Sequence, residues 1–191
     1  MNASLLTGSQ TVGPFFSPSL LREGASRNVL TEPATVGERI RIEGRVLDGD
    51  GAPVPDAMVE IWQADADGHY NHPADSRPGI DFTGYGRSGT SEDGGYWFET
   101  IKPGSVPFDA QRMQAPHVVV TIFSRGLLNH LVTRLYFADE PANDSDPILS
   151  RYVPGERRST LLARRETKGT IAIYRFDIIM QGTGETVFFN L

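Results

Sequence analysis

The chain has 191 residues, no cysteine and a formal net charge of -6, with a sequence pI near 5.2. Without cysteine it has no disulfide, thiolate metal site or cysteine nucleophile, and a reducing compartment is permitted. The acidic balance argues against a surface for nucleic acid or anionic membranes. We find no signal-peptide pattern and no run of the ~20 apolar residues that span a membrane, so we expect a cytoplasmic protein with one domain.

The first 36 residues show no hydrophobic periodicity. Residues 7–18, TGSQTVGPFFSP, are rich in turn formers but carry two adjacent phenylalanines, whose exposure to water would be unfavourable. We therefore interpret residues 1–36 as an arm that packs either on its own core or on a partner subunit. In the second case, Gly13-Pro14 would allow the backbone to approach a ligand closely.

Alternating apolar and polar residues predict that residues 37–191 are built mainly from β-strands. The predicted strands cover residues 38–47, 57–63, 96–101, 117–123, 131–137, 170–181 and 185–189. Turns rich in Gly, Pro and Asp join them, and one helix is expected over 157–165. These elements predict an all-β fold, an antiparallel β-sandwich with long loops and one short helix. We expect function to lie in the loops.

The loop over residues 65–85 is the first candidate for a metal site. Its acidic residues are spaced by two, but it lacks the glutamate and the flanking helices of an EF-hand, so calcium is not expected. His69, Tyr70 and His72 are either metal ligands or solvated loop groups. No G-x-S-x-G, P-loop or H-E-x-x-H motif is present. These patterns alone predict a β-sandwich with a site built from loops.

An ordered series of motifs adds a family resemblance. It begins with GRVLDGDGAPVPDAMVEIWQADADGHY at residues 44–70. Shorter matches follow at 86–87, 93–94, 96–98, 100–104, 115–117, 133–137 and 174–178. The series resembles the intradiol ring-cleavage dioxygenases from about residue 7 to the C-terminus. The arm SQTVGPFF and the ending GETVFFNL resemble the α-type chains of those members that cleave protocatechuate.

The resemblance implies a mononuclear non-haem Fe(III) held by two tyrosines and two histidines, a donor set that suits ferric iron. The iron-bound catecholate would react with dioxygen, and its ring would open between the two hydroxyl-bearing carbons. Tyr70 and His117 stand at two of the four ligand positions, but Val106 and Val119 stand at the others. Because valine offers no donor atom, the resemblance implies no metal and no catalytic residue in this chain.

The resemblance therefore implies an iron-free subunit that pairs with a homologous β subunit carrying Fe(III), in a hetero-oligomer. It places four residues of the arm near the substrate: Thr11, Gly13, Pro14 and Phe15. It places Arg125 opposite the substrate carboxylate, which a guanidinium binds well. The alternative for Arg125 is an ordinary arginine in a turn.

Two other functions compete with this interpretation. One is a self-sufficient dioxygenase with altered ligands, such as Tyr70, His117 and either His69 or His72. The other is a non-catalytic binding module similar to transthyretin-like domains, which share the pattern of strand, DGxG turn, proline and strand. The iron content of the pure chain tests the first alternative, and its oligomeric state tests the second.

Overall fold

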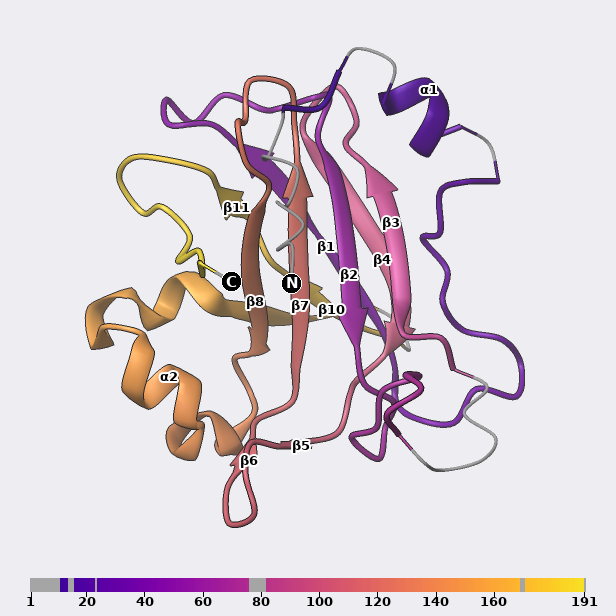
Figure 1. The fold of residues 1–191 in the computed structure, drawn as a ribbon, viewed down its shortest axis with the longest axis vertical. Helices are drawn as coiled ribbons and strands as arrows, with labels where there is room; N and C mark the ends of the chain where they lie inside the picture. The colour runs from indigo at the N-terminus through magenta and orange to yellow at the C-terminus, as the bar shows by residue number, and fades with distance from the viewer. Residues whose placement is uncertain (1–10, 14–15, 23, 76–81, 169–170, 191) are drawn as a thin grey trace, which may run out of the picture.

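The computed structural model describes residues 11–13, 16–22, 24–75, 82–168 and 171–190 (Figure 1). The elements are α1 (Phe16–Leu20), β1 (Arg39–Leu47), β2 (Met58–Gln63), β3 (Tyr85–Gly89), β4 (Gly95–Ile101), β5 (Val106–Pro107), β6 (Met113–Gln114), β7 (His117–Phe123), β8 (Leu131–Phe137), η1 (Pro141–Ser145), α2 (Pro147–Tyr152), η2 (Gly155–Leu161), β9 (Leu162–Lys168), β10 (Ile171–Arg175) and β11 (Ile178–Ile179). Among these residues no helix is long and apolar enough to cross a membrane.

The main sheet runs in the order β11-β1-β10-β9-β8-β7-β2-β3, with β4 paired to β1 (Figure 1). The β2–β7 and β7–β8 pairs are antiparallel, but β1 pairs in parallel with β10 and β11, and β8 with β9. The prediction of a mainly β protein is confirmed. The clearly antiparallel sandwich is not, because the sheet is nearly closed, with barrel-like curvature. The long connection through η1, α2 and η2 brings β9 back parallel to β8, as parallel pairing requires.

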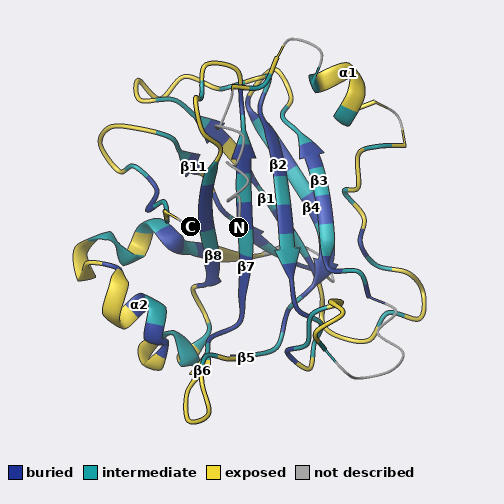
Figure 2. Ribbon diagram, viewed as in Figure 1, coloured by how far each residue is buried: buried dark blue, intermediate teal, exposed yellow. Residues whose placement is uncertain are grey.

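Alternate residues of the strands fill the space enclosed by the sheet, and Figure 2 shows the buried residues concentrated there. Alternating apolar residues of β1, of β2 with the preceding Ala57, and of the β10–β11 segment lie in one core cluster: Ile40, Ile42, Val46, Ala57, Val59, Ile61, Tyr174, Phe176 and Ile178. Each of these side chains is at most 3% exposed. The two-residue period therefore correctly predicts which face of each of these strands is buried.

The helix predicted over 157–165 is wrong. Residues Gly155–Leu161 form the short 3-10 helix η2, and the chain then enters strand β9, which pairs with β10. Ala163 is buried while Arg164 and Arg165 are exposed, and both arginines pair with residues of β10 in the ladder. Tertiary pairing overrides local helix propensity here.

Several other elements differ from the prediction. The closing strand expected at 185–189 is wrong, since this segment has no ladder and makes only scattered bonds such as Phe189 N to Val132 O, at 2.8 Å. The strand expected at 170–181 is divided into β10 and β11. Strand β3 and the β5–β6 hairpin lie outside the predicted strands. Strands β5 and β6 have two residues each, too few for a hydrophobic period to be visible.

Part of the predicted arm packs on this chain's own sheet. Arg27 bridges to Arg87 and Val29 to Glu99, and the side chain of Leu30 lies in the core cluster. The earlier residues Thr11 and Gly13 are exposed. Helix α1 lies at the end of the sheet opposite to β5 and β6 (Figure 1).

Asp146 is a fully buried carboxylate that joins helix α2 to the start of β7. One oxygen accepts the backbone N–H groups of Ile148 and Leu149, each at 2.8 Å, which caps the helix. The other accepts the N–H of Ala115 at 2.8 Å. The sequence signal for this cap is Asp146-Pro147, an N-cap residue followed by proline at the first helical position.

We predict that Asp146→Ala lowers the free energy of unfolding by roughly 2–4 kcal/mol, because it leaves buried N–H groups without an acceptor. Urea unfolding followed by circular dichroism measures this loss. Asp144→Ala is the control, because Asp144 is an exposed neighbour. Equal stability of the two variants would contradict the role given to Asp146.

Candidate functional site

The four positions implied by the family resemblance converge at the β5–β6 end of the sheet. Trp62, Val119 and Arg134 are direct cross-strand partners on β2, β7 and β8, so their side chains share the outer face. Tyr70 stacks on Trp62, with ring centroids 5.8 Å apart and planes 14° from parallel. Tyr70 and Val106 both line an open cavity of about 520 Å³. The structure therefore brings together the positions that the sequence singled out.

A glycine holds the loop that carries Tyr70 close to the segment before β5. Gly68 has φ of +81°, and a Cβ there would lie 1.9 Å from the carbonyl oxygen of Ser105. The N–H of Gly104 donates to the carbonyl of Asp65 at 2.8 Å. Only glycine combines this left-handed backbone with so close an approach. The contact places Tyr70 beside Val106.

His117 begins β7 and is 3% exposed. Its Nδ1 lies 2.8 Å from the carbonyl oxygen of Ala115, which only accepts, so Nδ1 carries the proton. Burial lowers the pKa of His117 to about 4, and the nearby charge of Arg134 acts in the same direction. The imidazole is therefore neutral near pH 7. Burial also raises the pKa of Tyr70, which keeps its phenol protonated.

These residues do not fit a four-ligand ferric site. Val106 and Val119 offer no donor atom, and the described part of the chain has no group of three or more His, Asp or Glu side chains that could hold a metal. His69 and His72 line the same cavity but have partners within their loop. His69 Nδ1 lies 3.3 Å from a carboxylate oxygen of Asp75, and His72 Nδ1 accepts the N–H of Ala74.

Arg125, which was predicted to contact the substrate carboxylate, lies elsewhere. Arg125 is on the β7–β8 loop, its side chain 67% exposed and paired with the carboxylate of Asp56. This loop and helix α1 lie at the same end of the sheet, opposite the cavity beside Tyr70 (Figure 1). Thr11 and Gly13 are exposed, whereas Pro14 and Phe15 lie outside the described residues. The structure thus places Arg125 far from the vacated ligand positions.

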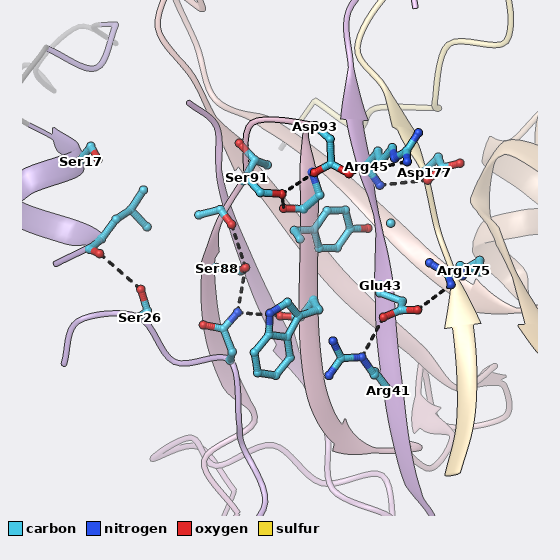
Figure 3. A pocket seen from close by; sticks show the side chains of 18 residues that line it. Ser17, Ser26, Arg41, Glu43, Arg45, Ser88, Ser91, Asp93, Arg175 and Asp177 are labelled. Carbon is cyan, nitrogen blue, oxygen red and sulfur yellow. Dashed lines mark hydrogen bonds and ion pairs between the residues drawn. The ribbon is translucent and has the colours of Figure 1, made fainter. Parts of the chain in front are cut away.

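A larger cavity, of about 820 Å³, lies over the outer faces of β1 and β4 (Figure 3). Arg41 and Arg175 both pair with Glu43 at 2.8 Å, and Arg41 also lies over the ring of Trp97 at 4.3 Å. No histidine is among its described lining residues. Its charges neutralise one another, and it offers no group suited to acid–base chemistry near neutral pH.

The sequence interpretation missed Trp62 and Arg134 as members of this site. Both residues lie inside motifs that were matched to the family, but neither was considered as a neighbour of the ligand positions. Because they are cross-strand partners of Val119, only the register of β2, β7 and β8 reveals them. That register depends on loops between the strands, so periodicity within one strand does not give it.

Comparison with known proteins identifies the family. A family model described as Dioxygenase matches residues 12–182. The protocatechuate 3,4-dioxygenase alpha chain of Burkholderia cepacia is 42% identical over 196 residues, which cover 97% of each chain. The beta chain from the same organism is 34% identical, over 94% of this chain and 77% of that one.

Solved structures show the same fold. The dioxygenase domain of a carbohydrate-binding fusion from Streptomyces sp. SirexAA-E has a TM-score of 0.65 and 26% identity, covering 92% of this chain and 98% of that one. Catechol 1,2-dioxygenase from Pseudomonas arvilla C-1 has a TM-score of 0.65 and 23% identity, covering 81% and 55%. The chain belongs to the family of intradiol dioxygenases. Within it, the identity to the alpha chain exceeds the identity to the beta chain.

We predict a pH dependence of stability that comes from His117. In the unfolded chain, His117 takes up a proton near its ordinary pKa of 6.5. In the folded chain, burial lowers this pKa to about 4. Stability is therefore lost as the pH falls through this window, by about 3 kcal/mol for this group. His117→Gln should remove that part of the slope in urea unfolding between pH 7 and pH 4, whereas His130→Gln, at an exposed histidine, should not. Identical slopes in both variants would refute the assignment.

Proposed function

We propose that this chain is the iron-free α subunit of a protocatechuate 3,4-dioxygenase. Its partner is a homologous β subunit that carries Fe(III), and together they form a hetero-oligomer of α–β pairs. The assembly cleaves protocatechuate between its two hydroxylated carbons with dioxygen, giving 3-carboxy-cis,cis-muconate. It works in the cytoplasm, where a chain without cysteine needs no oxidising environment.

The observation that carries the proposal is the pair of aliphatic side chains, Val106 and Val119, at positions that converge with Tyr70 and His117. A chain that keeps the family fold while offering two donors of four is suited to a supporting role. Its greater similarity to an alpha chain than to a beta chain supports the same interpretation.

The chemistry of this chain is then binding, not bond cleavage. Arg125 supplies a guanidinium that faces the substrate carboxylate, and the arm around Thr11, Gly13, Pro14 and Phe15 forms part of the pocket wall. An exposed ion pair such as Arg125–Asp56 contributes at most about 1 kcal/mol, so the arginine exchanges partners at little cost. Once the partner subunit excludes water, a bidentate bond from arginine to a carboxylate is strong and directional. The bond would hold the ring in one orientation at the iron of the partner.

Co-expression tests the subunit assignment. We expect this chain alone to bind less than about a tenth of an iron per chain and to cleave no protocatechuate, because two donors are missing. Co-purification with a homologous chain that bears two tyrosines and two histidines should give ring cleavage and the visible absorption of a ferric tyrosinate. Ring cleavage and that absorption from this chain alone would overturn the proposal.

Substitution of Arg125 tests the substrate contact. Arg125→Ala in the assembled enzyme should lower kcat/KM for protocatechuate by roughly 10- to 150-fold, the equivalent of about 1.5–3 kcal/mol for a charged hydrogen bond. Plain catechol, which lacks the carboxylate, should be affected far less. Arg151→Ala is the matched control, because Arg151 is exposed and contacts the ring of Tyr152. An equal loss on both substrates would show that Arg125 does not bind the carboxylate.

A further inference from the structure

The guanidinium of Arg134 lies next to Val119, one of the two family ligand positions at which this chain has no donor atom. Arg134 stands on β8 directly opposite Val119 on β7, and the neighbouring pair on the same face is His117 with Tyr136. Its Nη1 donates to Oε1 of Gln114 at 2.7 Å and lies 3.4 Å from the hydroxyl oxygen of Tyr136. Gln114 also lines the Tyr70 cavity, so Arg134 is bonded directly to one wall of that cavity.

Strand β6 ties this guanidinium to the remaining ligand position. Gln114 is the cross-strand partner of Val106 in the β5–β6 hairpin, and its Nε2 donates to the carbonyl of Pro107 at 3.1 Å. The positive charge of Arg134 also acts on the phenol of Tyr70 and the imidazole of His117. Arg134 is thus connected to all four ligand positions. It pairs across the strands with Val119 and shares Gln114 as a partner with Val106. Its charge acts on Tyr70 and His117.

Within the described part of the chain, the guanidinium of Arg134 makes no ion pair with a carboxylate. Its side chain is partly buried, and its hydrogen bonds in the described residues go to an amide oxygen and a phenol. The carboxylate connected to this group is that of Asp146, which accepts from the Tyr136 hydroxyl at 3.4 Å and is otherwise engaged by backbone N–H groups. A cation held by neutral partners keeps its charge, and this charge acts on Tyr70 and His117 nearby.

We propose that Arg134 replaces the metal in this chain and excludes a cation from the site, independently of the two missing donors. Its guanidinium supplies a fixed positive charge and hydrogen-bond donors where family members with a complete ligand set would hold iron. In general, two unit positive charges about 5 Å apart, at the effective dielectric of partly buried sites, repel each other enough to weaken binding on the order of a hundredfold. Restoring the donors alone would therefore not restore the metal site. This inference concerns the chain alone and does not rest on the proposed pairing.

The experiment compares two donor-restored variants of the full chain, Val106→Tyr/Val119→His with and without Arg134→Gln. Glutamine removes the charge and keeps a hydrogen-bond donor for Gln114. After loading with iron and desalting, only the triple variant should show the ferric-tyrosinate absorption and retain iron, at least tenfold more than the double variant. Arg151→Gln in the double variant is the control for loss of a distant positive charge, and it should leave iron content unchanged.

Val106 is buried, at 4% exposure, so a tyrosine there risks misfolding. A smaller pair, Val119→His with and without Arg134→Gln, changes only the outer face of the sheet. Tyr70, His117 and the introduced histidine then offer three donors, which suit Zn²⁺. Titration calorimetry with Zn²⁺ should give at least tenfold tighter binding when Arg134 is replaced. Within each pair, the folded variant that keeps Arg134 is compared with the one that carries Arg134→Gln. Equal metal affinity of the two members in either pair would overturn the proposal.

Discussion

The two-residue period of strand β7 is the constraint on which the rest of the structure depends. Val118, Val120 and Ile122 point into the core and are at most 1% exposed, so the intervening residues must face outward. His117 and Val119 are therefore held on the outer face, beside Trp62 and the strand partners on β8. A change that shifted the register by one residue would place the valines outside and the histidine in the core. The burial of the strand thus fixes the geometry of the candidate site.

The sequence carried enough information for β7 and β8, whose observed bounds agree with runs of β-branched and aromatic residues. It did not give β9, because Leu161-Leu162 flanked by arginines has the local character of a helix, and the pairing that makes it a strand comes from β10. The same limit applies at the candidate site. Loss of two ligands is visible at Val106 and Val119, but the position of Arg134 opposite Val119 depends on a register set by the β7–β8 loop.

Losing metal donors and gaining a cation have different energetic consequences. Replacing a donor by valine removes favourable metal bonds but leaves an apolar pocket that costs the fold little. A partly buried guanidinium adds a desolvation cost, which the bonds to Gln114 and Tyr136 offset only in part. In the proposed role the charge itself is what the arrangement provides, because it disfavours the binding of a cation.

The two ends of the sheet consequently have different roles in the proposed assembly. At one end, the cavity beside Tyr70 retains the framework of a metal site, with a neutral imidazole and a protonated phenol. At the other end, Arg125 and helix α1 are exposed and available to a partner. If the iron-bearing subunit has the same fold, its own site lies at the corresponding end of its sheet. The Arg125 end of this chain would then have to meet the metal end of its partner. That arrangement requires the two subunits to pack with opposite ends together, as in a pseudo-two-fold dimer.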